Sequence, residues 1–183
     1  CTYTEALFLE EKEDLEMAQA YLNDQKKRIK NAEPILGPRN VHYHYWPDAD
    51  MYYKGTWMLH TMRHVVDDDS LWKAAIRQLY QAYRHQGLHT QTVLDFLSRA
   101  TGHSLQPLML EYLQAQHPPT LAYEVSGLFR KKLRFRWKSQ RSDFRMPLKI
   151  KMGGQERWIY PDKEWKEIPY AEPLEWPTSS VPA

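Results

Sequence analysis

The sequence is poor in cysteine and in long hydrophobic runs, and its seven glycines form no phosphate-binding pattern. One cysteine, Cys1, excludes an intrachain disulfide and a cysteine-based zinc finger, and it leaves the redox compartment undecided. The longest apolar runs span three or four residues, so we expect no membrane partner. The Ser126-Gly127 pair lacks the flanking residues of a nucleophile elbow. Nothing therefore indicates nucleophilic catalysis by serine or cysteine.

The composition is that of a folded chain. Of 183 residues, 42% are hydrophobic and 26% are charged, which excludes wholesale disorder. A chain of this size can bury roughly 70% of the surface that it exposes when unfolded. The net charge of +2 argues against a dedicated nucleic-acid binder, so we expect no nucleic-acid partner. The chain opens without an initiator methionine or a signal peptide, and we expect it to be a piece of a longer protein.

The first two thirds of the chain carry apolar residues at helical spacing. The spacing predicts about five helices packed as a bundle over residues 1–117. Pro34, Gly37, Pro38 and Pro47 predict a loop after the first helix. The expected segments are Glu5–Lys30, Tyr52–Val66, a third helix capped within Asp67–Asp69 and ended by Gly87, a fourth capped by Thr90 and ended by Gly102, and a fifth capped by Ser104. The expected buried stripe is Trp72, Ile76, Leu79 and Tyr83 in the third helix, and Val93, Leu94 and Leu97 in the fourth.

The pattern changes at Pro118-Pro119. Apolar and polar residues then alternate over 121–125, 133–137 and 146–150, and Gly153-Gly154 forms a two-residue hairpin turn. Such alternation predicts antiparallel strands with one solvated face, as in a small β-sandwich over residues 118–170. A mobile tail is expected over 171–183. The fold class is therefore α+β, with the helical bundle first and the sandwich second.

Two histidines could bind a metal. His60 and His64 lie at i and i+4, which is the zinc-binding half of an H-E-x-x-H motif. Thr61 stands where the general-base glutamate of that motif belongs. Because the two histidines fall away from the Leu59/Met62 stripe, we expect surface or capping histidines and no metal site.

A basic run covers residues 130–141. It contains seven lysines and arginines and no acidic residue, and Leu133, Phe135 and Trp137 alternate with the charges. Aromatics on the face opposite the charges do not suit a nucleic-acid platform. We expect a solvated outer face, or one docked on an acidic neighbour.

The segment Tyr52-Tyr53-Lys54-Gly55 resembles the Tyr-x-Lys-Gly motif of the gluzincin zinc aminopeptidases, the family of aminopeptidase N and leukotriene hydrolase. Thr2–Phe8 is similar to the residues that follow the family's Trp-x-x-Glu-Gly segment. The resemblance covers about residues 1–125 and is strongest to bacterial members. It implies the carboxyl-terminal part of a metallopeptidase catalytic domain, followed by a β-sandwich. Export to the cell envelope is compatible with it, but the sequence does not determine the localisation.

The resemblance also implies what this chain lacks. The family holds its zinc with the two histidines of H-E-x-x-H and a later glutamate, and the third ligand would lie about three residues before Cys1. The general base and the Gly-x-Met-x-Asn motif are absent as well. We therefore expect zinc and a peptide substrate in the complete enzyme only. For these 183 residues alone we expect no metal ligand, no bound cofactor, no hydrolysis, and self-association through exposed apolar faces.

One catalytic residue remains by position in the motif. The resemblance assigns Tyr52 the role of donating a hydrogen bond to the oxyanion of the tetrahedral intermediate. Gly55 is expected to permit close helix packing, and Glu5 to be either a supporting partner of the site or an exposed helix acid. Two alternatives stay open: a non-enzymatic interaction module that uses the basic strand, and a small metal-binding domain that uses His60 and His64. Sequence gives neither the cleaved residue nor whether the parent protein is active.

Overall fold

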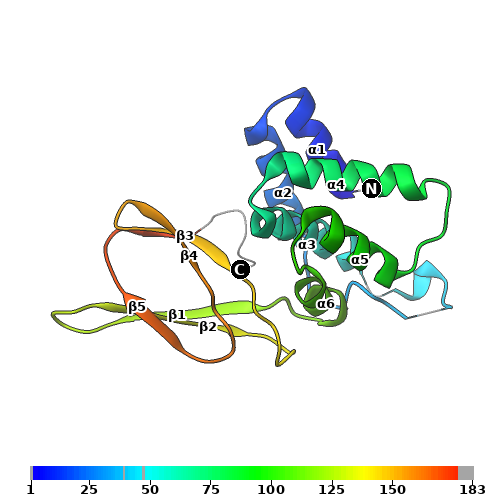
Figure 1. Ribbon diagram of the computed structural model, residues 1–183. Coiled ribbons are helices and arrows are strands. Elements are labelled where there is room, and N and C mark those ends of the chain that lie inside the picture. Colours follow the sequence, from blue (N-terminus) through cyan, green and yellow to red (C-terminus); the bar gives the residue numbers. More distant parts are fainter. Residues whose placement is uncertain (1, 39, 47, 177–183) are drawn as a thin grey trace.

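The computed structural model describes residues 2–38, 40–46 and 48–176, in which a helical part is followed by a β part (Figure 1). The predicted α+β fold class is confirmed. The helices are α1 (Thr2–Lys12), α2 (Leu15–Lys27), α3 (Asp50–Val66), α4 (Asp69–Tyr83), α5 (Thr90–Thr101) and α6 (Gln106–Gln114), with one 3₁₀ turn, Tyr43–Tyr45. The strands are β1 (Thr120–Ser126), β2 (Lys132–Lys138), β3 (Leu148–Met152), β4 (Gln155–Ile159), β5 (Lys166–Pro169) and β6 (Leu174–Glu175). None of the helices in these ranges is long and apolar enough to cross a bilayer.

The single helix predicted over Glu5–Lys30 is wrong, because the chain breaks before Leu15. Asp14 is extended, with φ −159° and ψ 177°, and its carboxylate accepts a hydrogen bond from the Met17 N–H at 2.8 Å. An aspartate in this position caps a new helix. The two helices then pack against each other, and Ala18 and Leu22 of α2 are buried.

The predicted apolar stripes of the next helices are confirmed. Trp72 of α4 and Leu94 and Leu97 of α5 are almost completely buried. Asp68 caps α4 through the Leu71 N–H, as expected. Gly102 ends α5 at a positive φ of 70°, a conformation that glycine adopts without strain.

Two other expected caps are wrong. The residue at the N-cap of α5 is His89, so Thr90 is already helical. The residue at the N-cap of α6 is Leu105, not Ser104, and neither N-cap residue makes a side-chain capping bond. The third expected helix is α4. It ends at Tyr83, four residues before Gly87, so the end predicted at Gly87 is wrong.

The β part contains two antiparallel three-stranded sheets, ordered β1-β2-β5 and β4-β3-β6. The predicted Gly153-Gly154 turn joins β3 to β4, with both residues at positive φ. Strand β6 pairs with β3 inside the segment expected to be a mobile tail. Residues 177–183 of that tail lie outside the described residues.

One continuous hydrophobic core joins the two parts. It contains Met62 of α3, Tyr112 of α6 and Phe135 of β2. The buried Glu111 carboxylate on α6 accepts the backbone N–H groups of Gln140, at 2.7 Å, and Arg141, at 3.0 Å, in the β2–β3 connection. The helical part therefore holds the β part through both apolar and polar contacts.

Candidate functional site

Helix α3 carries the motif residues, and its first turn is fixed by a buried carboxylate. Asp50 is fully buried and accepts the backbone N–H groups of Lys30 at 2.9 Å and Ala32 at 2.6 Å, with a longer contact to that of Glu33 at 3.4 Å. These donors belong to the loop that leaves α2. A carboxylate that accepts several backbone N–H groups is well satisfied when buried. Asp50 therefore attaches this loop to the start of α3.

Lys54 of the motif completes this attachment. Its Nζ lies 3.6 Å from the Asp50 carboxylate, and both side chains are buried. The ammonium also donates to the backbone carbonyls of Glu33 and Gln116, the latter at 2.8 Å. Burial lowers the pKa of Lys54, and the Asp50 carboxylate opposes that shift. Lys54 thus ties α3 to the α2 loop and to the segment after α6, which is a positioning task.

Tyr52 lies in the first turn of α3 and points to the surface. Its side chain is 52% exposed, and its carbonyl accepts a hydrogen bond from Thr56 Oγ1 at 2.8 Å. Its hydroxyl pairs with no group in the described ranges. The neighbouring Tyr53 is half-buried and lies under the Arg28 guanidinium, 5.9 Å from the ring centroid. Of the two tyrosines, Tyr52 therefore has the phenol that is open to a ligand.

The structure does not support the packing role expected for Gly55. A Cβ added at Gly55 would meet nothing within 4 Å, so no neighbouring helix approaches closely there. Glu5 is exposed and accepts a hydrogen bond from the Tyr21 hydroxyl. Burial and this carboxylate raise the pKa of Tyr21 to about 12. Glu5 therefore joins α1 to α2.

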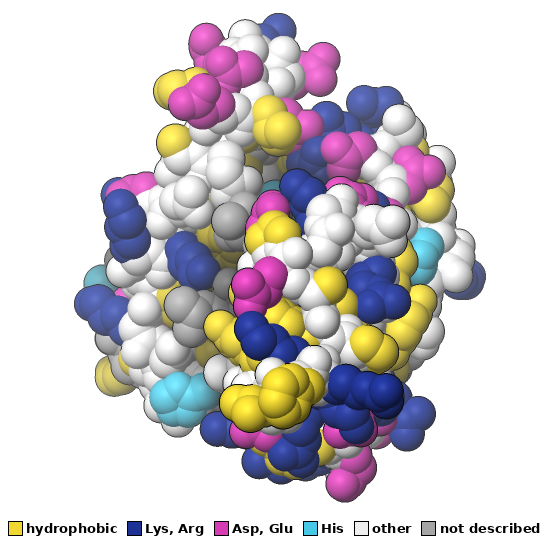
Figure 2. Space-filling view, turned by 90° about the vertical axis from the view of Figure 1, so that its left-hand side faces the viewer, with side chains coloured by type: hydrophobic (Ala, Val, Ile, Leu, Met, Phe, Trp, Pro, Cys, Tyr) yellow, Lys and Arg dark blue, Asp and Glu magenta, His cyan; other side chains and the backbone are white. Residues whose placement is uncertain are grey.

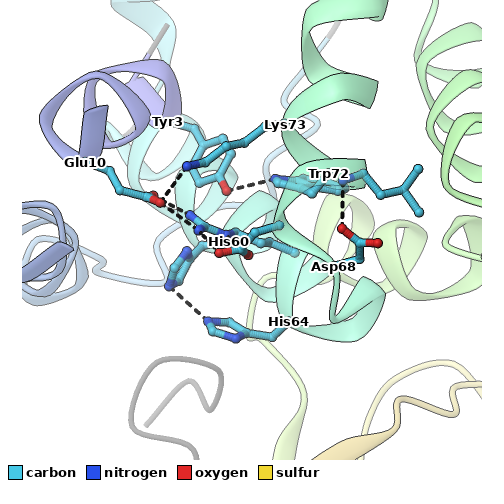
Figure 3. Close-up of polar contacts among 10 residues, drawn as sticks. Tyr3, Glu10, His60, His64, Asp68, Trp72 and Lys73 are labelled. Carbon is cyan, nitrogen blue, oxygen red and sulfur yellow. Dashed lines mark hydrogen bonds and ion pairs between the residues drawn. The ribbon is translucent and has the colours of Figure 1, made fainter. Parts of the chain in front are cut away.

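Behind the motif, α1, α3 and α4 share a polar network (Figure 3). The Arg63 guanidinium is buried and binds the Glu10 carboxylate, at 2.6 and 2.9 Å, and the Asp69 carboxylate, at 2.7 and 2.6 Å. Lys73 donates to Glu10 at 2.7 Å. The Arg63 guanidinium, through hydrogen bonding, holds the pKa of Glu10 below its usual range. Glu10 is therefore a paired structural anion and a poor candidate for a general base.

The two histidines lie beside this network and contact each other. His60 Nε2 lies 3.2 Å from His64 Nε2, and their rings are nearly perpendicular (Figure 3). His60 is buried beside Trp57 and Tyr3, so the surface position expected for it is wrong; Trp57 is also buried. Burial lowers the pKa of His60 to about 3 and also lowers that of His64. Both rings are therefore neutral at pH 7.

Among the described residues, the pair has no third side chain that would complete a metal site. Within residues 2–38, 40–46 and 48–176, no three His, Cys, Asp or Glu side chains come together in a way that could hold a metal ion. A metal-bound histidine normally donates its second ring N–H to an acceptor, whereas His60 Nδ1 is buried without a partner. The hydrogen-bonded pair is better explained as part of the helix packing.

Acidic neighbours partly neutralise the basic strand. Arg134 pairs with Glu124 of β1 at 2.5 Å, and Lys132 pairs with Glu167 of β5. The guanidinium groups of Arg134 and Arg136 lie 5.0 and 4.8 Å from the Trp165 ring centroid. The outer face of β2 is therefore covered within this chain more than the sequence indicates.

The tip of the β1–β2 hairpin is apolar and exposed. Leu128 and Phe129 are 86% and 94% exposed, and Tyr123 and Val125 of β1 are also exposed. Figure 2 shows hydrophobic side chains beside lysines and arginines in the lower part of the face that it presents. The alternation of β1 predicts a buried apolar face, but on that face only Leu121 is buried.

Sequence reasoning missed the polar contacts that position α3. Asp50 and Lys54 are one helical turn apart, which is a readable signal for a pair. Their backbone partners at Glu33 and Gln116 are far away in the sequence and give no such signal. The same holds for Arg63 and Glu10, which are 53 residues apart.

No protein-family model and no curated protein matches the sequence. The fold is that of a helical bundle joined to small antiparallel sheets, and it is similar to part of a solved enzyme. That structure is the crystal structure of Legionella pneumophila aminopeptidase A in complex with aspartic acid, with a TM-score of 0.71 and 13% sequence identity. The match covers 100% of this chain, which spans 21% of the length of the aminopeptidase chain. At this identity the likeness shows a shared fold.

Proposed function

We propose that this chain is the carboxyl-terminal part of the catalytic region of a gluzincin-type zinc aminopeptidase, with Tyr52 as its catalytic residue. The observation that carries the proposal is the exposed phenol of Tyr52 on a helix start that Asp50 and Lys54 hold in place. The fold likeness to an aminopeptidase supports it. So does the order of residues in the Tyr-x-Lys-Gly segment.

The chemistry assigned to Tyr52 needs a neutral hydrogen-bond donor. A phenol has a pKa of about 10 and stays protonated at neutral pH. When a peptide carbonyl is attacked, its oxygen becomes negatively charged, and a donor already aimed at that position stabilises the transition state. Such a donor contributes about 2.7–4 kcal/mol, which is about 10²–10³ in rate. The hydroxyl makes no hydrogen bond within the described ranges, so none would have to be broken before it donates.

The residues described do not fit a zinc site, so no step of this mechanism runs through the metal. The described ranges hold no three-ligand cluster, and His60 and His64 face each other. In this proposal the zinc, the general base and the recognition of the substrate's amino group come from other parts of the protein. The chain by itself would then not cleave peptides.

The test is Tyr52→Phe in a protein that joins this chain to the zinc-binding half. With an aminoacyl-arylamide as substrate, kcat is expected to fall about 10²–10³-fold. Tyr53→Phe is the matched control, and we expect its kcat to stay within about threefold of the wild type. A fall of less than about threefold for Tyr52→Phe would refute the assignment.

The alternative is a non-enzymatic interaction module, and the hairpin tip favours it. Leu128 and Phe129 are exposed beside Arg130 and Lys131, a surface that could dock on an acidic, partly apolar partner. The ion pairs of Arg134 and Lys132 with acids of this chain count against a nucleic-acid partner. Salt-dependent binding of the 183-residue chain to an acidic protein surface would favour this alternative.

A further inference from the structure

Strand β1 has one side that pairs with no other described strand. It pairs with β2 over seven consecutive residues, Thr120–Ser126, without a bulge. No backbone group of Thr120–Ser126 bonds to another described segment. Figure 1 shows the β1–β2 hairpin projecting away from the helical part. The alternate N–H and C=O groups of β1 that point away from β2 can therefore pair with a further strand.

The other described sheet edges carry features that oppose such pairing, and β1 does not. Strand β5 has four residues and ends in Pro169, β6 has two residues, and β4 carries Glu156 and Arg157. Short length, proline and charge all stop an edge from accepting another strand. The one charge of β1 is Glu124, whose carboxylate is bound by Arg134 at 2.5 Å. Strand β1 is therefore the edge of this chain that is open to pairing.

The apolar face of β1 is also left partly uncovered. Opposite residues of an antiparallel pair lie on the same face, so Leu121, Tyr123 and Val125 continue the buried apolar face of β2. Leu121 is buried, but Tyr123 is 52% exposed and Val125 is 43% exposed. The Tyr123 ring contacts Trp176, with the ring centroids 4.6 Å apart. A strand added beside β1 would cover more of Tyr123 and Val125.

The sequence of β1 is complementary to itself when two copies run antiparallel about a two-fold axis at Tyr123. Each residue then faces one of matching character in the second copy: Tyr123 faces Tyr123, Leu121 faces Val125, Ala122 faces Glu124, and Thr120 faces Ser126. Aromatic, apolar and hydroxyl cross-strand pairs of this kind stabilise a sheet, and no like charges lie directly opposite each other.

Other registers of the same pairing are worse. A two-fold axis at Glu124 would place two Glu124 carboxylates directly opposite each other, which is destabilising. A two-fold axis at Ala122 would place Val125 opposite Pro119, which has no N–H to donate. Axes between residues are excluded, because they would bring the apolar face of one copy next to the polar face of the other.

We propose that two copies of this chain pair through β1, antiparallel about Tyr123, and so join their three-stranded sheets into one continuous sheet. Both copies use the same strand, so the pairing closes at a dimer whose outer edges are the protected β5 strands. Each hairpin tip, with the exposed Leu128 and Phe129, then extends past the start of β1 in the other copy. The inference does not depend on the proposed peptidase function, because Tyr52 takes no part.

Sedimentation velocity of the 183-residue chain over a concentration series tests the dimer. One pair of strands makes a small interface, so we expect a dissociation constant on the order of 1–100 µM. The chain should sediment as a monomer well below this range and as a dimer, with no larger species, well above it.

A charge exchange at Tyr123 tests the register. Tyr123→Lys and Tyr123→Glu each place like charges opposite each other, and each is expected to weaken the dimer at least about tenfold. An equal mixture of the two variants places lysine opposite glutamate, and should form a heterodimer at least about tenfold tighter than either homodimer. Tyr160→Lys changes an exposed tyrosine just after β4 and is the matched control, with an expected change below about twofold.

Two further measurements do not depend on the contact between Tyr123 and Trp176. Val125→Lys adds an edge lysine and should also weaken the dimer at least about tenfold. In the unmodified chain, hydrogen exchange of the β1 amides that point away from β2 should slow as the concentration rises, because these amides become bonded in the dimer. Circular dichroism of each variant checks that it is folded.

Each contrary result overturns the proposal. A monomer at every concentration would show that the edge does not pair. A dimer that neither charge at Tyr123 weakens would be formed by another surface, such as the hairpin tip. A mixture that restores no heterodimer would exclude the register, and growth beyond a dimer would exclude the closed two-fold pairing. None of these results changes with the outcome of Tyr52→Phe, so the two proposals are tested separately.

Discussion

The Nζ of Lys54 lies 3.6 Å from the carboxylate of Asp50, and neither side chain is appreciably exposed to solvent. The pair lies in the first turns of α3, directly beside Tyr52. A buried pair of this kind is sensitive to the loss of one partner, because the remaining charge is then uncompensated. The position of Tyr52 therefore depends on contacts that its own side chain does not make.

Replacing Lys54 by methionine should destabilise the chain strongly. The variant leaves Asp50 without a cation and the carbonyls of Glu33 and Gln116 without this donor. We expect the free energy of unfolding to fall by about 3–5 kcal/mol, measured by urea denaturation.

The control is Lys30→Met, which removes a lysine with an exposed side chain that pairs with Asp48 at 2.8 Å. Because exposed ion pairs contribute little, its cost should be much smaller than that of Lys54→Met. If Lys54→Met costs no more than Lys30→Met, the buried pair does not fix the start of α3.

Acid should destabilise the chain through its buried histidines. The pKa of His60 is lowered to about 3, while an unfolded histidine has a pKa of about 6.5. Between these values the unfolded chain binds a proton that the folded chain does not. The stabilisation is therefore complete above pH 6.5 and is lost as the pH falls, by up to about 1.4 kcal/mol per pH unit for each such group.

Urea denaturation at several values from pH 7.5 to 4.5 measures this loss. The pKa of His64 is also lowered, so its protonation adds to the loss of stability. The carboxylates of Glu10 and Asp69 lie near the two histidines, and their lowered pKa values mean that they titrate mostly below pH 4.5. His60→Leu is expected to remove roughly half of the slope. An unchanged slope in that variant would show that other groups cause the acid sensitivity.

Two tyrosine-to-phenylalanine changes should differ in their effect on stability. Tyr3→Phe leaves the buried Trp72 Nε1–H without the hydroxyl that accepts it at 2.9 Å, and should cost about 1–3 kcal/mol. Tyr52→Phe removes a hydroxyl that makes no hydrogen bond in the described ranges, and should cost less than about 0.5 kcal/mol. Thermal unfolding of both variants makes the comparison. A large cost for Tyr52→Phe would mean that its hydroxyl is a structural group.

Serine at Leu128 and Phe129 should reduce self-association. These side chains form the exposed tip of the β1–β2 hairpin, where they cover no core. The double variant is expected to bind less anilinonaphthalene sulfonate and to sediment as a smaller species than the unmodified chain. Phe8→Ser, at an exposed site on α1, is the comparison. An equal effect of Phe8→Ser would place the contact elsewhere.

The elements whose periodic residues face the core could be predicted from sequence. The stripe of α4, the glycine end of α5 and the glycine turn between β3 and β4 are local patterns, and the structure confirms them. The break at Asp14 was missed because the acidic residues around it suit the interior of a helix as well as its start. The exposure of Tyr123 could not be read from the alternation in β1, because alternation gives the same expectation for every residue on one face of a strand.

The candidate site was predictable only at the level of its motif. The spacing in Tyr52–Gly55 identifies a helix start. It does not reveal that backbone N–H groups of the loop between α2 and α3 donate hydrogen bonds to Asp50. The burial of His60 was missed because only the Leu59/Met62 face of the helix was expected to be buried. In the structure α1 also packs on α3, and His60 is buried. Such contacts depend on how helices distant in sequence meet.

Helix α6 and the segment directly after it make contacts with two different parts of the molecule. The Glu111 carboxylate accepts hydrogen bonds from the connection between β2 and β3. Just beyond the helix, the Gln116 carbonyl accepts a hydrogen bond from the Lys54 ammonium. The end of α6 therefore lies between the contact to the sheets and the contact to Lys54, two residues after Tyr52. We expect that deleting the strands would also remove support from the start of α3, although no strand residue bonds to Lys54 or Asp50 in the described ranges.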